Sequence, residues 1–510
     1  MVLLKKETEI LIVGAGPVGL LAANLLGQYN HSCIIVDKLE KPYTIPRAIS
    51  IDDETLRIIQ AAGLLEDFLK ISRSVKGLQL CKQNGELLFT FTKKATSGFD
   101  ASHLFYSPEL EKLLRKKLEL YSNVQFLENV ELYKIEENKT NVIAYLKRGK
   151  QSDLLIDTQF LIGCDGANSK VRALADFKIK DLGYAAKNLK VDIKLTKAKA
   201  YTPWIKKFCS SKDKAYVFLD SWQHHKRIEF SLQKGQADEL YHYAEKIKDV
   251  LATSNFEILH SSVYTFKSHL AKTWLNNRIA LAGDAAHLMP PYIGQGMCAG
   301  FRDVHNLCWK LHYSKTHPTT DTLLNTYQKE RYTHTRFVIR LTILTGKLFR
   351  TKLYLLLILA KRILPTILLT FQAPPIRLKK GFYLKGKRHG FLFPQFLVTS
   401  QDGKQVYSDD LLGKDFTLVI FNENNLITVT PQENDILEEA GIEIINIITT
   451  KINGEIPNSC LLDNSKQFAN WFKKRKIKAA LVRPDRYIFS LHYTIELKKI
   501  ILTLTTTIKA

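Results

Sequence analysis

Two glycine-rich turns, far apart in the chain, carry the residue types from which a nucleotide site could be built. The first, Gly14-Ala-Gly-Pro-Val-Gly19, follows an apolar stretch, Ile10–Val13, that predicts a strand, and it precedes a predicted helix. A G-x-G-x-x-G turn between a strand and a helix lets the backbone approach a pyrophosphate, which the helix N-terminus then stabilises. Alone, this turn indicates a dinucleotide and does not say which one.

The second segment, Arg278 to Leu311, indicates which dinucleotide. Its predicted strand, Ile279–Ala282, ends in Gly283-Asp284, where a carboxylate can accept a hydrogen bond from a polyol hydroxyl. A further turn, Gly294-Gln295-Gly296, precedes another helix close to the cofactor. FAD has a ribityl chain and a ring that need this second cradle, whereas NAD has neither. The two segments together predict a flavoprotein.

Acidic residues mark the next two elements of the same unit. Asp37 ends a predicted strand, Cys33–Val36, about 20 residues past the loop, where a carboxylate meets the adenosine ribose in dinucleotide-binding folds. Farther along, Asp52 or Asp53 is expected to cap a predicted helix.

Composition favours a large enzyme of two or three domains, with 510 residues of which 45% are hydrophobic. We expect no signal peptide, because the first apolar run leads directly into the glycine loop. The seven cysteines have neither C-x-x-C nor metal-ligand spacing, so we expect reduced, mostly buried thiols, no metal site and a cytoplasmic location. The net charge of +24 comes from dispersed lysines without a nucleic-acid fold signature, so no nucleic-acid partner is expected.

One apolar segment, residues 352–371, is interrupted by Lys361, Arg362 and Pro365. Neither half reaches the roughly 20 apolar residues that a membrane span needs. A helix packed over the cofactor domain is the favoured interpretation. A basic, apolar helix lying on a membrane surface is the alternative.

The order of predicted elements indicates an α/β protein with an inserted sheet. Residues 1–178 and 276–375 read as a Rossmann-like cofactor domain, and residues 179–275 as an antiparallel-sheet substrate domain rich in aromatic residues. A Pro/Lys/Gly-rich linker at 376–395 leads to a separate α/β domain at 396–510. Its predicted elements are Thr417–Phe421, Glu443–Ile448, Gln467–Arg475 and Ala479–Val482.

Three segments in this order resemble the class A flavin-dependent aromatic hydroxylases. They are the Gly14–Gly19 loop, Cys164-Asp-Gly-Ala-Asn-Ser-Lys-Val-Arg172, similar to the family's DG motif, and Leu281-Ala-Gly-Asp-Ala-Ala-His287, similar to its GD motif. Three more are similar to the branch of 3-(3-hydroxyphenyl)propionate hydroxylase: Pro46–Arg57, Tyr327–Arg331 and Val482–Tyr487. The resemblance covers essentially the whole chain. It implies a p-hydroxybenzoate hydroxylase-like FAD domain and a C-terminal thioredoxin-like domain without the redox C-x-x-C.

The resemblance also implies an activity. NADH or NADPH reduces FAD, O₂ adds at flavin C4a, and the C4a-hydroperoxide hydroxylates a phenolic substrate ortho or para to its hydroxyl. The flavin supplies the chemistry, and the protein orients, shields and tunes it. A small aromatic substrate is therefore expected, and a homodimer is left open.

Site residues follow partly from position and partly from this resemblance. Gly14, Gly16 and Gly19 allow the turn, the pyrophosphate approach and helix–strand packing. By resemblance Arg47 contacts FAD, Asp165 bridges the cofactor and nicotinamide regions, Asp284 binds the ribityl chain, and Pro291 shapes the flavin's front wall. The complete cofactor-binding set is Gly14, Ala15, Gly16, Pro17, Val18, Gly19, Asp37, Lys38, Arg47, Val130, Asp165, Gly166, Gly283, Asp284, Gly294, Gly296 and Met297.

One catalytic role follows from physics. Reduced flavin carries negative charge near N1, and Gly296 and Met297 begin a helix beside that edge of the ring. Free N–H groups and the positive helix end would stabilise the anion by about 1–2 kcal/mol. The catalytic set is therefore Pro291, Gly296 and Met297.

Two positions depart from the family pattern. Ser107 replaces a glutamine that contacts FAD in many relatives and is too short to copy that contact. Lys38 stands where arginine is common, which weakens stacking over adenine.

The sequence specifies the substrate pocket only weakly. His224 and His225 could act as bases that deprotonate a phenol, yet a position in a solvent-exposed hairpin turn is the favoured interpretation. Tyr216 and Phe218 are expected to pack in the core or on the sheet face and not to contact the substrate.

Two other functions stay open. One is a membrane-surface flavoenzyme that acts on a lipid-like quinone, favoured by segment 352–371. The other is a flavin-binding protein without hydroxylation turnover, mildly favoured by Ser107.

Overall fold

The structure is a computed structural model of the whole chain. It describes residues 4–42, 44–82, 85–92, 95, 97–149, 153–197, 203–209, 215–232, 240–317, 322–350, 377–386, 389–422, 426 and 429–509. Within them it contains three large sheets and one small sheet, joined by helices, and the expected α/β class is confirmed.

The first sheet carries the glycine loop, in the strand order β17-β18-β11-β1-β2-β8. The strands from β18 to β8 pair in parallel, and buried Ile, Leu and Val side chains give β18, β11, β1 and β2 apolar faces on both sides. The strands are β1 (Leu4–Val13), β2 (Cys33–Val36), β8 (Val124–Leu127), β9 (Val130–Glu137), β10 (Val142–Arg148), β11 (Asp153–Gly163), β17 (Leu275–Asn276) and β18 (Ile279–Leu281). The helices of this part are α1 (Pro17–Gln28), α2 (Asp53–Ala61), α3 (Leu65–Lys70), α4 (Ser107–Leu118) and α5 (Lys170–Leu174).

The second sheet, with order β19-β16-β12-β15-β14-β13-β5-β6, is antiparallel except for the β13–β5 pair. It draws in β5 and β6 from the N-terminal part and β19 from the GD region, which the sequence had not assigned to it. Its strands are β5 (Gly77–Lys82), β6 (Leu87–Thr92), β12 (Ile179–Leu195), β13 (Trp204–Cys209), β14 (Tyr216–Asp220), β15 (His225–Leu232), β16 (Phe256–Ala271) and β19 (His287–Leu288). Helices η1 (Leu240–Tyr243) and α6 (Ala244–Leu251) follow β15, and a small sheet, β3 (Ser50–Asp52), β7 (Ser102–Phe105) and β4 (Ser72–Ser74), completes this region.

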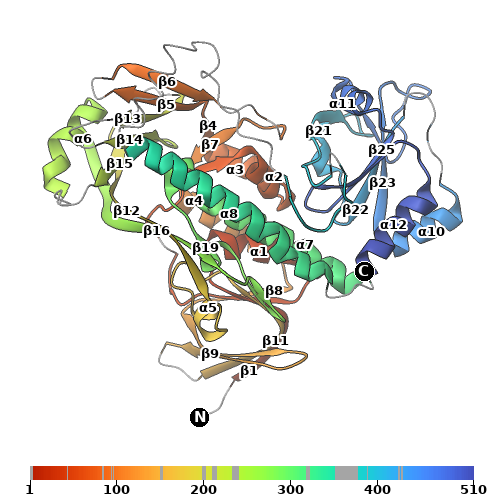
Figure 1. Cartoon of the computed structure of the whole chain (residues 1–510), viewed down its shortest axis with the longest axis horizontal. Helices are drawn as coiled ribbons and strands as arrows, with labels where there is room; N and C mark the ends of the chain where they lie inside the picture. Colours follow the sequence, from red (N-terminus) through yellow and green to blue (C-terminus); the bar gives the residue numbers. More distant parts are fainter. Residues whose placement is uncertain are drawn as a thin grey trace.

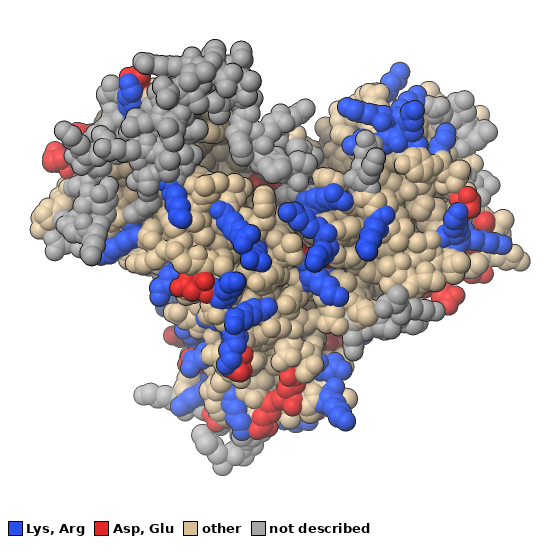
Figure 2. All heavy atoms as spheres, in the orientation of Figure 1, with Lys and Arg blue, Asp and Glu red and all other residues tan. Residues whose placement is uncertain are grey.

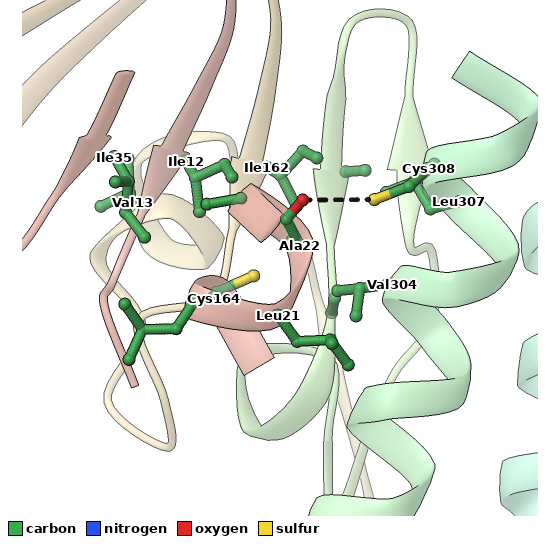
Figure 3. Packing of buried hydrophobic residues seen from close by; sticks show 14 of the residues in the cluster. Ile12, Val13, Leu21, Ala22, Ile35, Ile162, Cys164, Val304, Leu307 and Cys308 are labelled. Atoms are coloured by element: carbon green, nitrogen blue, oxygen red, sulfur yellow. Dashed lines mark hydrogen bonds between the residues drawn. The ribbon is translucent and has the colours of Figure 1, made fainter. Parts of the chain in front are cut away.

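Helix α7 (Gly296–Thr316) is the central element of the core. Its Val304, Leu307 and Cys308 pack over α1, and the Cys308 Sγ lies 3.9 Å from the Ala22 carbonyl oxygen (Figure 3). Figure 1 shows α8 (Thr322–Arg350) crossing the molecule from beside α12 toward the second sheet. Charged side chains also lie buried among the apolar ones of α7, among them Arg302, Asp303 and Lys310.

The C-terminal sheet has the order β21-β20-β24-β23-β22-β25-β26 and lies beside α7 and α8 (Figure 1, blue). Strands β22, β23 and β24 are parallel, and β25 and β26 add antiparallel edges. The thioredoxin-like likeness expected for this domain stays a prediction. The elements are β20 (Leu397–Thr399), β21 (Gln405–Tyr407), η4 (Ser408–Asp410), β22 (Phe416–Phe421), α10 (Pro431–Glu439), β23 (Ile442–Ile448), β24 (Cys460–Leu462), α11 (Gln467–Arg475), β25 (Ala479–Val482), β26 (Ile488–His492) and α12 (Leu497–Lys509).

The three branch-specific segments, Pro46–Arg57, Tyr327–Arg331 and Val482–Tyr487, meet at the border between this sheet and α7. Arg483 donates to Glu330 at 2.8 Å, and Tyr487 donates to Glu54 at 2.7 Å. All of these side chains are buried. The C-terminal domain is therefore joined to the glycine-loop domain through a polar interior.

The cysteines and the basic residues can both be located in the structure. The six cysteines whose side chains the structure describes are buried and unbridged, as expected. Lys and Arg are spread over the face shown in Figure 2, with a group over α11 that includes Lys473 and Lys474. Segment 352–371 lies outside the described residues, and none of the described helices is long and apolar enough to cross a membrane.

The buried pair Arg57–Asp409 offers a test of the domain border. Arg57 binds both carboxylate oxygens of Asp409, at 2.7 and 2.8 Å. Asp409→Ala should lower the free energy of unfolding by about 3 kcal/mol, because it leaves a buried guanidinium without its anion. Asp67→Ala, which breaks the exposed pair with Lys70, should change it little. Urea denaturation measures both, and equal losses would contradict the inference.

Candidate functional site

The glycine loop places its three glycines in two different environments. Gly14 has a φ of +104°, and a Cβ there would lie 2.5 Å from the Cys164 carbonyl oxygen. A Cβ on Gly19 would lie 1.9 Å from the Gly14 oxygen, whereas one on Gly16 would meet nothing within 4 Å. Gly14 and Gly19 thus pack against protein, and Gly16 faces open space.

The open space in front of Gly16 lies at the N-terminus of helix α1. Gly16 is its N-cap and Pro17 its first residue, so the N–H groups of Val18 and Gly19 in the first turn have no acceptor within the helix. These donors and the positive helix end suit an anion.

Asp37, at the end of β2, binds the loop itself. Its Oδ2 accepts from the Ala15 N–H at 2.7 Å, and its Oδ1 accepts from the Leu39 N–H at 2.9 Å. Ala15 belongs to the predicted cofactor-binding set, but its N–H group is already engaged by this carboxylate. Val130 is buried and donates its N–H to the Asp37 carbonyl, and Lys38 is exposed.

The DG turn leaves one carboxylate oxygen unmatched. Asp165 accepts through Oδ2 from the N–H groups of Lys170 (2.6 Å) and Val171 (3.1 Å), while the Ser169 hydroxyl caps α5. Its Oδ1 is buried and has no partner among the described residues. A Cβ on the following Gly166 would meet nothing within 4 Å. Asp165 thus helps to cap α5, and its second oxygen remains an unmatched acceptor beside open space.

In the GD turn, η2 (Gly283–Ala285), Gly283 has a φ of +60°, which favours glycine. Solvent reaches the Asp284 side chain although protein surrounds it. That surrounding protein raises the pKa of the Asp284 carboxyl by desolvation, and His287 and Arg47 oppose the shift. The Asp284 carboxyl is therefore open to solvent, with protein around it, and lies near the exposed Arg47.

The start of α7 approaches the same place. After η3 (Pro291–Ile293), Gly294 adopts a φ of +65°, and Gln295 is the N-cap. A Cβ on Gly296 would meet nothing within 4 Å, whereas one on Gly300 would lie 2.6 Å from Val18 Cγ2 and 3.1 Å from Gly283 Cα. Gly300 thus brings α7 against the first turn of α1 and the GD turn, so the two helix N-termini lie in one region.

A buried carboxylate that the sequence did not single out holds these turns together. Asp303, on α7, accepts from the Gly283 N–H (3.1 Å), His287 Nε2 (2.7 Å) and Arg331 Nε (2.9 Å). Tyr327 adds a hydrogen bond from its hydroxyl to the Leu281 carbonyl at 2.7 Å. The signal available in the sequence was a group of four polar residues, Arg302, Asp303, His305 and Asn306, that interrupts the apolar positions of this helix.

The second sheet supports Arg47 from the other side. Arg227 donates to the Arg47 carbonyl at 2.8 Å and to the Pro46 carbonyl at 2.6 Å, and it pairs with buried Asp192. Ser107, expected only as a lost contact, accepts from the Arg47 N–H at 3.0 Å. The Arg47 backbone is therefore fixed from two elements.

The expectation that His225 lies in solvent is wrong. Its hairpin is present between β14 and β15, but His225 is buried, binds Asp192 Oδ1 at 2.9 Å and lies against the Tyr106 ring. Burial lowers its pKa, although Asp192 opposes the shift. Tyr216 is buried in the core behind the sheet, as expected.

Two protein families match this chain, and together they cover most of it. Residues 7–342 match the FAD binding domain family, and residues 390–507 match the HcaD C-terminal domain family. A "Probable NADH-specific resorcinol 4-hydroxylase" of Rhodococcus jostii (strain RHA1) is 28% identical over 96% of this chain and 92% of that protein. A 3-(3-hydroxy-phenyl)propionate/3-hydroxycinnamic acid hydroxylase of Escherichia coli (strain K12) is 27% identical over 94% of this chain and 91% of that protein.

Solved structures share the fold. The flavin-dependent monooxygenase PieE, in complex with FAD and substrate, superposes with a TM-score of 0.80 at 17% identity, covering 99% of both chains. Aklavinone-11 hydroxylase, with FAD and aklavinone, gives a TM-score of 0.77 at 17% identity over 98% of this chain and 99% of that one.

Asp303→Asn should destabilise the protein in a pH-dependent way. Although burial raises it, the pKa of Asp303 is held below its ordinary value by His287 and Arg331. The stabilisation is therefore complete above the unfolded-state pKa, about 4, and is lost as the pH falls through the lower folded-state value. At neutral pH we expect a loss of about 3 kcal/mol.

Denaturation at several pH values measures this difference, which should shrink below pH about 4. Asp176→Asn, at an exposed position, is the control and should show no such loss. A difference between wild type and Asp303→Asn that does not vary with pH would contradict the proposed role of the charge.

Proposed function

The chain belongs to the FAD binding domain family, and we propose that it is an FAD-dependent monooxygenase that uses NAD(P)H and O₂ to hydroxylate a phenolic aromatic compound. The observation that carries this proposal is the meeting of two helix N-termini, those of α1 and α7, beside open space and the solvent-accessible Asp284 carboxyl. A pyrophosphate, a polyol and an electron-accepting ring are the three groups that this arrangement suits.

The residues present fit FAD. Open space at Gly16 and the donors of Val18 and Gly19 would take the pyrophosphate. Asp284 would accept from the ribityl hydroxyls, and the unmatched Oδ1 of Asp165 offers a further acceptor. Asp37 keeps its proposed place beside the adenosine ribose, in addition to holding the loop.

Bound FAD would supply electron transfer from NAD(P)H and the activation of O₂. The chain's own contribution begins at α7, whose first-turn N–H groups, at Gly296 and Met297, have no acceptor within the helix and would lie beside the ring edge in this proposal. They would stabilise negative charge there. Pro291 would form the front wall, and Arg47, fixed by Arg227 and Ser107, would contact the cofactor.

For the substrate we propose a class of compound, for the reductant a first candidate, and for the assembly a homodimer. A small phenolic compound suits the names of both curated relatives, and NADH is the reductant to test first because one relative is named NADH-specific. A cytoplasmic location, a homodimer and a peripheral membrane contact through residues 352–371 remain proposals.

Product analysis tests the function directly. Purified protein saturated with FAD should oxidise NADH faster in the presence of its phenol, and hydroxylated product should account for most of the NADH consumed. The assay uses a panel of resorcinol-like and hydroxyphenylpropionate-like phenols, with lipid-like quinones as the alternative class. NADH oxidation that yields only peroxide with every phenol would contradict the proposal and favour a flavin protein without hydroxylation.

Gly296→Ala and Gly300→Ala form a matched pair on one helix. Gly296→Ala should keep the melting temperature of the FAD-free protein, because its Cβ enters open space, yet it should push the ring from the amides. Losing about 1 kcal/mol of anion stabilisation would lower the flavin reduction potential by about 20 mV. Gly300→Ala should instead lower the melting temperature, because its Cβ meets Val18 and Gly283.

Dye-equilibration titrations of FAD-saturated protein measure the potential, and thermal unfolding measures stability. A wild-type potential in saturated Gly296→Ala would show that α7 only shapes the site.

A further inference from the structure

A continuous chain of hydrogen bonds leads from the C-terminal domain toward the start of α7. It begins at Tyr487, directly before β26, whose buried hydroxyl donates to Glu54 Oε1 at 2.7 Å. The other carboxylate oxygen of Glu54 accepts from Arg302 Nε at 2.6 Å. Arg302 lies on α7, so a side chain of the C-terminal domain is connected to that helix through a single carboxylate.

The chain continues to the residue that precedes Gly296. Arg302 donates through Nη2 to Asp52 Oδ2 (2.6 Å) and through Nη1 to Gln295 Oε1 (3.1 Å). Gln295, the N-cap of α7, closes the ring by donating to Asp52 Oδ2 at 2.9 Å. Asp52 also caps α2 through Oδ1, so the ring is anchored on a second helix.

Each member of this chain has a fixed direction of hydrogen bonding. Burial, together with Glu54, raises the pKa of Tyr487 well above its ordinary value, so its hydroxyl stays a donor. The pKa of Arg302 is also raised: burial lowers it, but Asp52 and Glu54 outweigh that effect. These donors and acceptors cannot exchange roles. Removal of one side-chain group therefore leaves its buried partner without that hydrogen bond.

We propose that Tyr487 is a positioning residue through which the C-terminal domain sets the first turn of α7, and with it the ease of flavin reduction. The inference rests on the proposed flavin site at Gly296. Without the Tyr487 hydroxyl, the Glu54 carboxylate would be balanced by Arg302 alone. Arg302 would then move toward Glu54 and release Gln295, which loosens the turn that faces the ring.

The same helix offers a matched control at its other end. Tyr313 is also buried, and its hydroxyl donates across the same domain border to the Ala440 carbonyl at 2.7 Å. It lies about 25 Å along α7 from Gly296, at 1.5 Å per residue. Tyr313→Phe therefore removes an equivalent interdomain hydrogen bond without touching the ring of Asp52, Arg302 and Gln295.

The experiment compares Tyr487→Phe with Tyr313→Phe in the full-length, FAD-saturated protein. Stopped-flow reduction by NADH and the flavin reduction potential are the two measurements. Tyr487→Phe should slow flavin reduction about fivefold, within the range of couplings carried by such networks, and should lower the potential. Tyr313→Phe should keep both at wild-type values, even where the two variants lose similar stability to urea.

Wild-type reduction and potential in Tyr487→Phe would overturn the inference, and so would equal changes in both variants. If Tyr487→Phe yields no folded protein, Glu54→Gln is measured in its place, with the same expected outcome. This substitution keeps the shape of the side chain and removes the charge that attracts Arg302. A wild-type protein that takes up no FAD would overturn the proposed function and this inference with it. A flavin-loaded wild type with an unaffected Tyr487→Phe overturns the inference alone.

Discussion

The buried carboxylate of Asp303 is the interaction on which the rest of the site depends. A buried charge is costly unless every lone pair is matched, and Asp303 is matched by donors from three separate elements: the Gly283 backbone, His287 and Arg331. Each donor fixes α7 relative to another part of the fold. Because Gly300 also brings α7 against Gly283 and the start of α1, the two helix N-termini have little freedom to separate. A site for a long, anionic cofactor requires this fixed relation.

The buried polar contacts extend beyond Asp303 and join the C-terminal domain to α7 and α8. On α7, Arg302 binds Glu54, and Asn306, one turn later, binds Asp485. On α8, Glu330 binds Arg483. Relative motion of domains is the usual expectation unless their interface is large and hydrophobic, and here Trp309 and Tyr313 of α7 also share a buried apolar cluster with Phe416 and Phe489 of the C-terminal sheet. The C-terminal domain therefore completes the packing of the cofactor domain. The three branch-specific segments are the parts of the chain that meet there.

Local patterns predicted much of the fold and the backbone of the site. Strand Cys33–Val36, helix Gln467–Arg475 and strand Ala479–Val482 have the predicted bounds, because their periodicity and caps are local. Contacts between distant segments could not be predicted in this way. The sequence shows that Asp303 is a charged residue in an apolar helix, but not that Gly283 and Arg331 surround it. His225 was misplaced for the same reason: its hairpin is local, while burial against Tyr106 and Asp192 is not.

The central claim is that FAD lies between the N-termini of α1 and α7, so the most direct measurement is an experimental structure of the protein with added FAD. The account predicts one non-covalent FAD per chain, with its pyrophosphate at the first turn of α1, its ribityl hydroxyls at Asp284 and its ring edge at Gly296. An FAD bound elsewhere, or a ring edge that does not face the first turn of α7, would contradict the account.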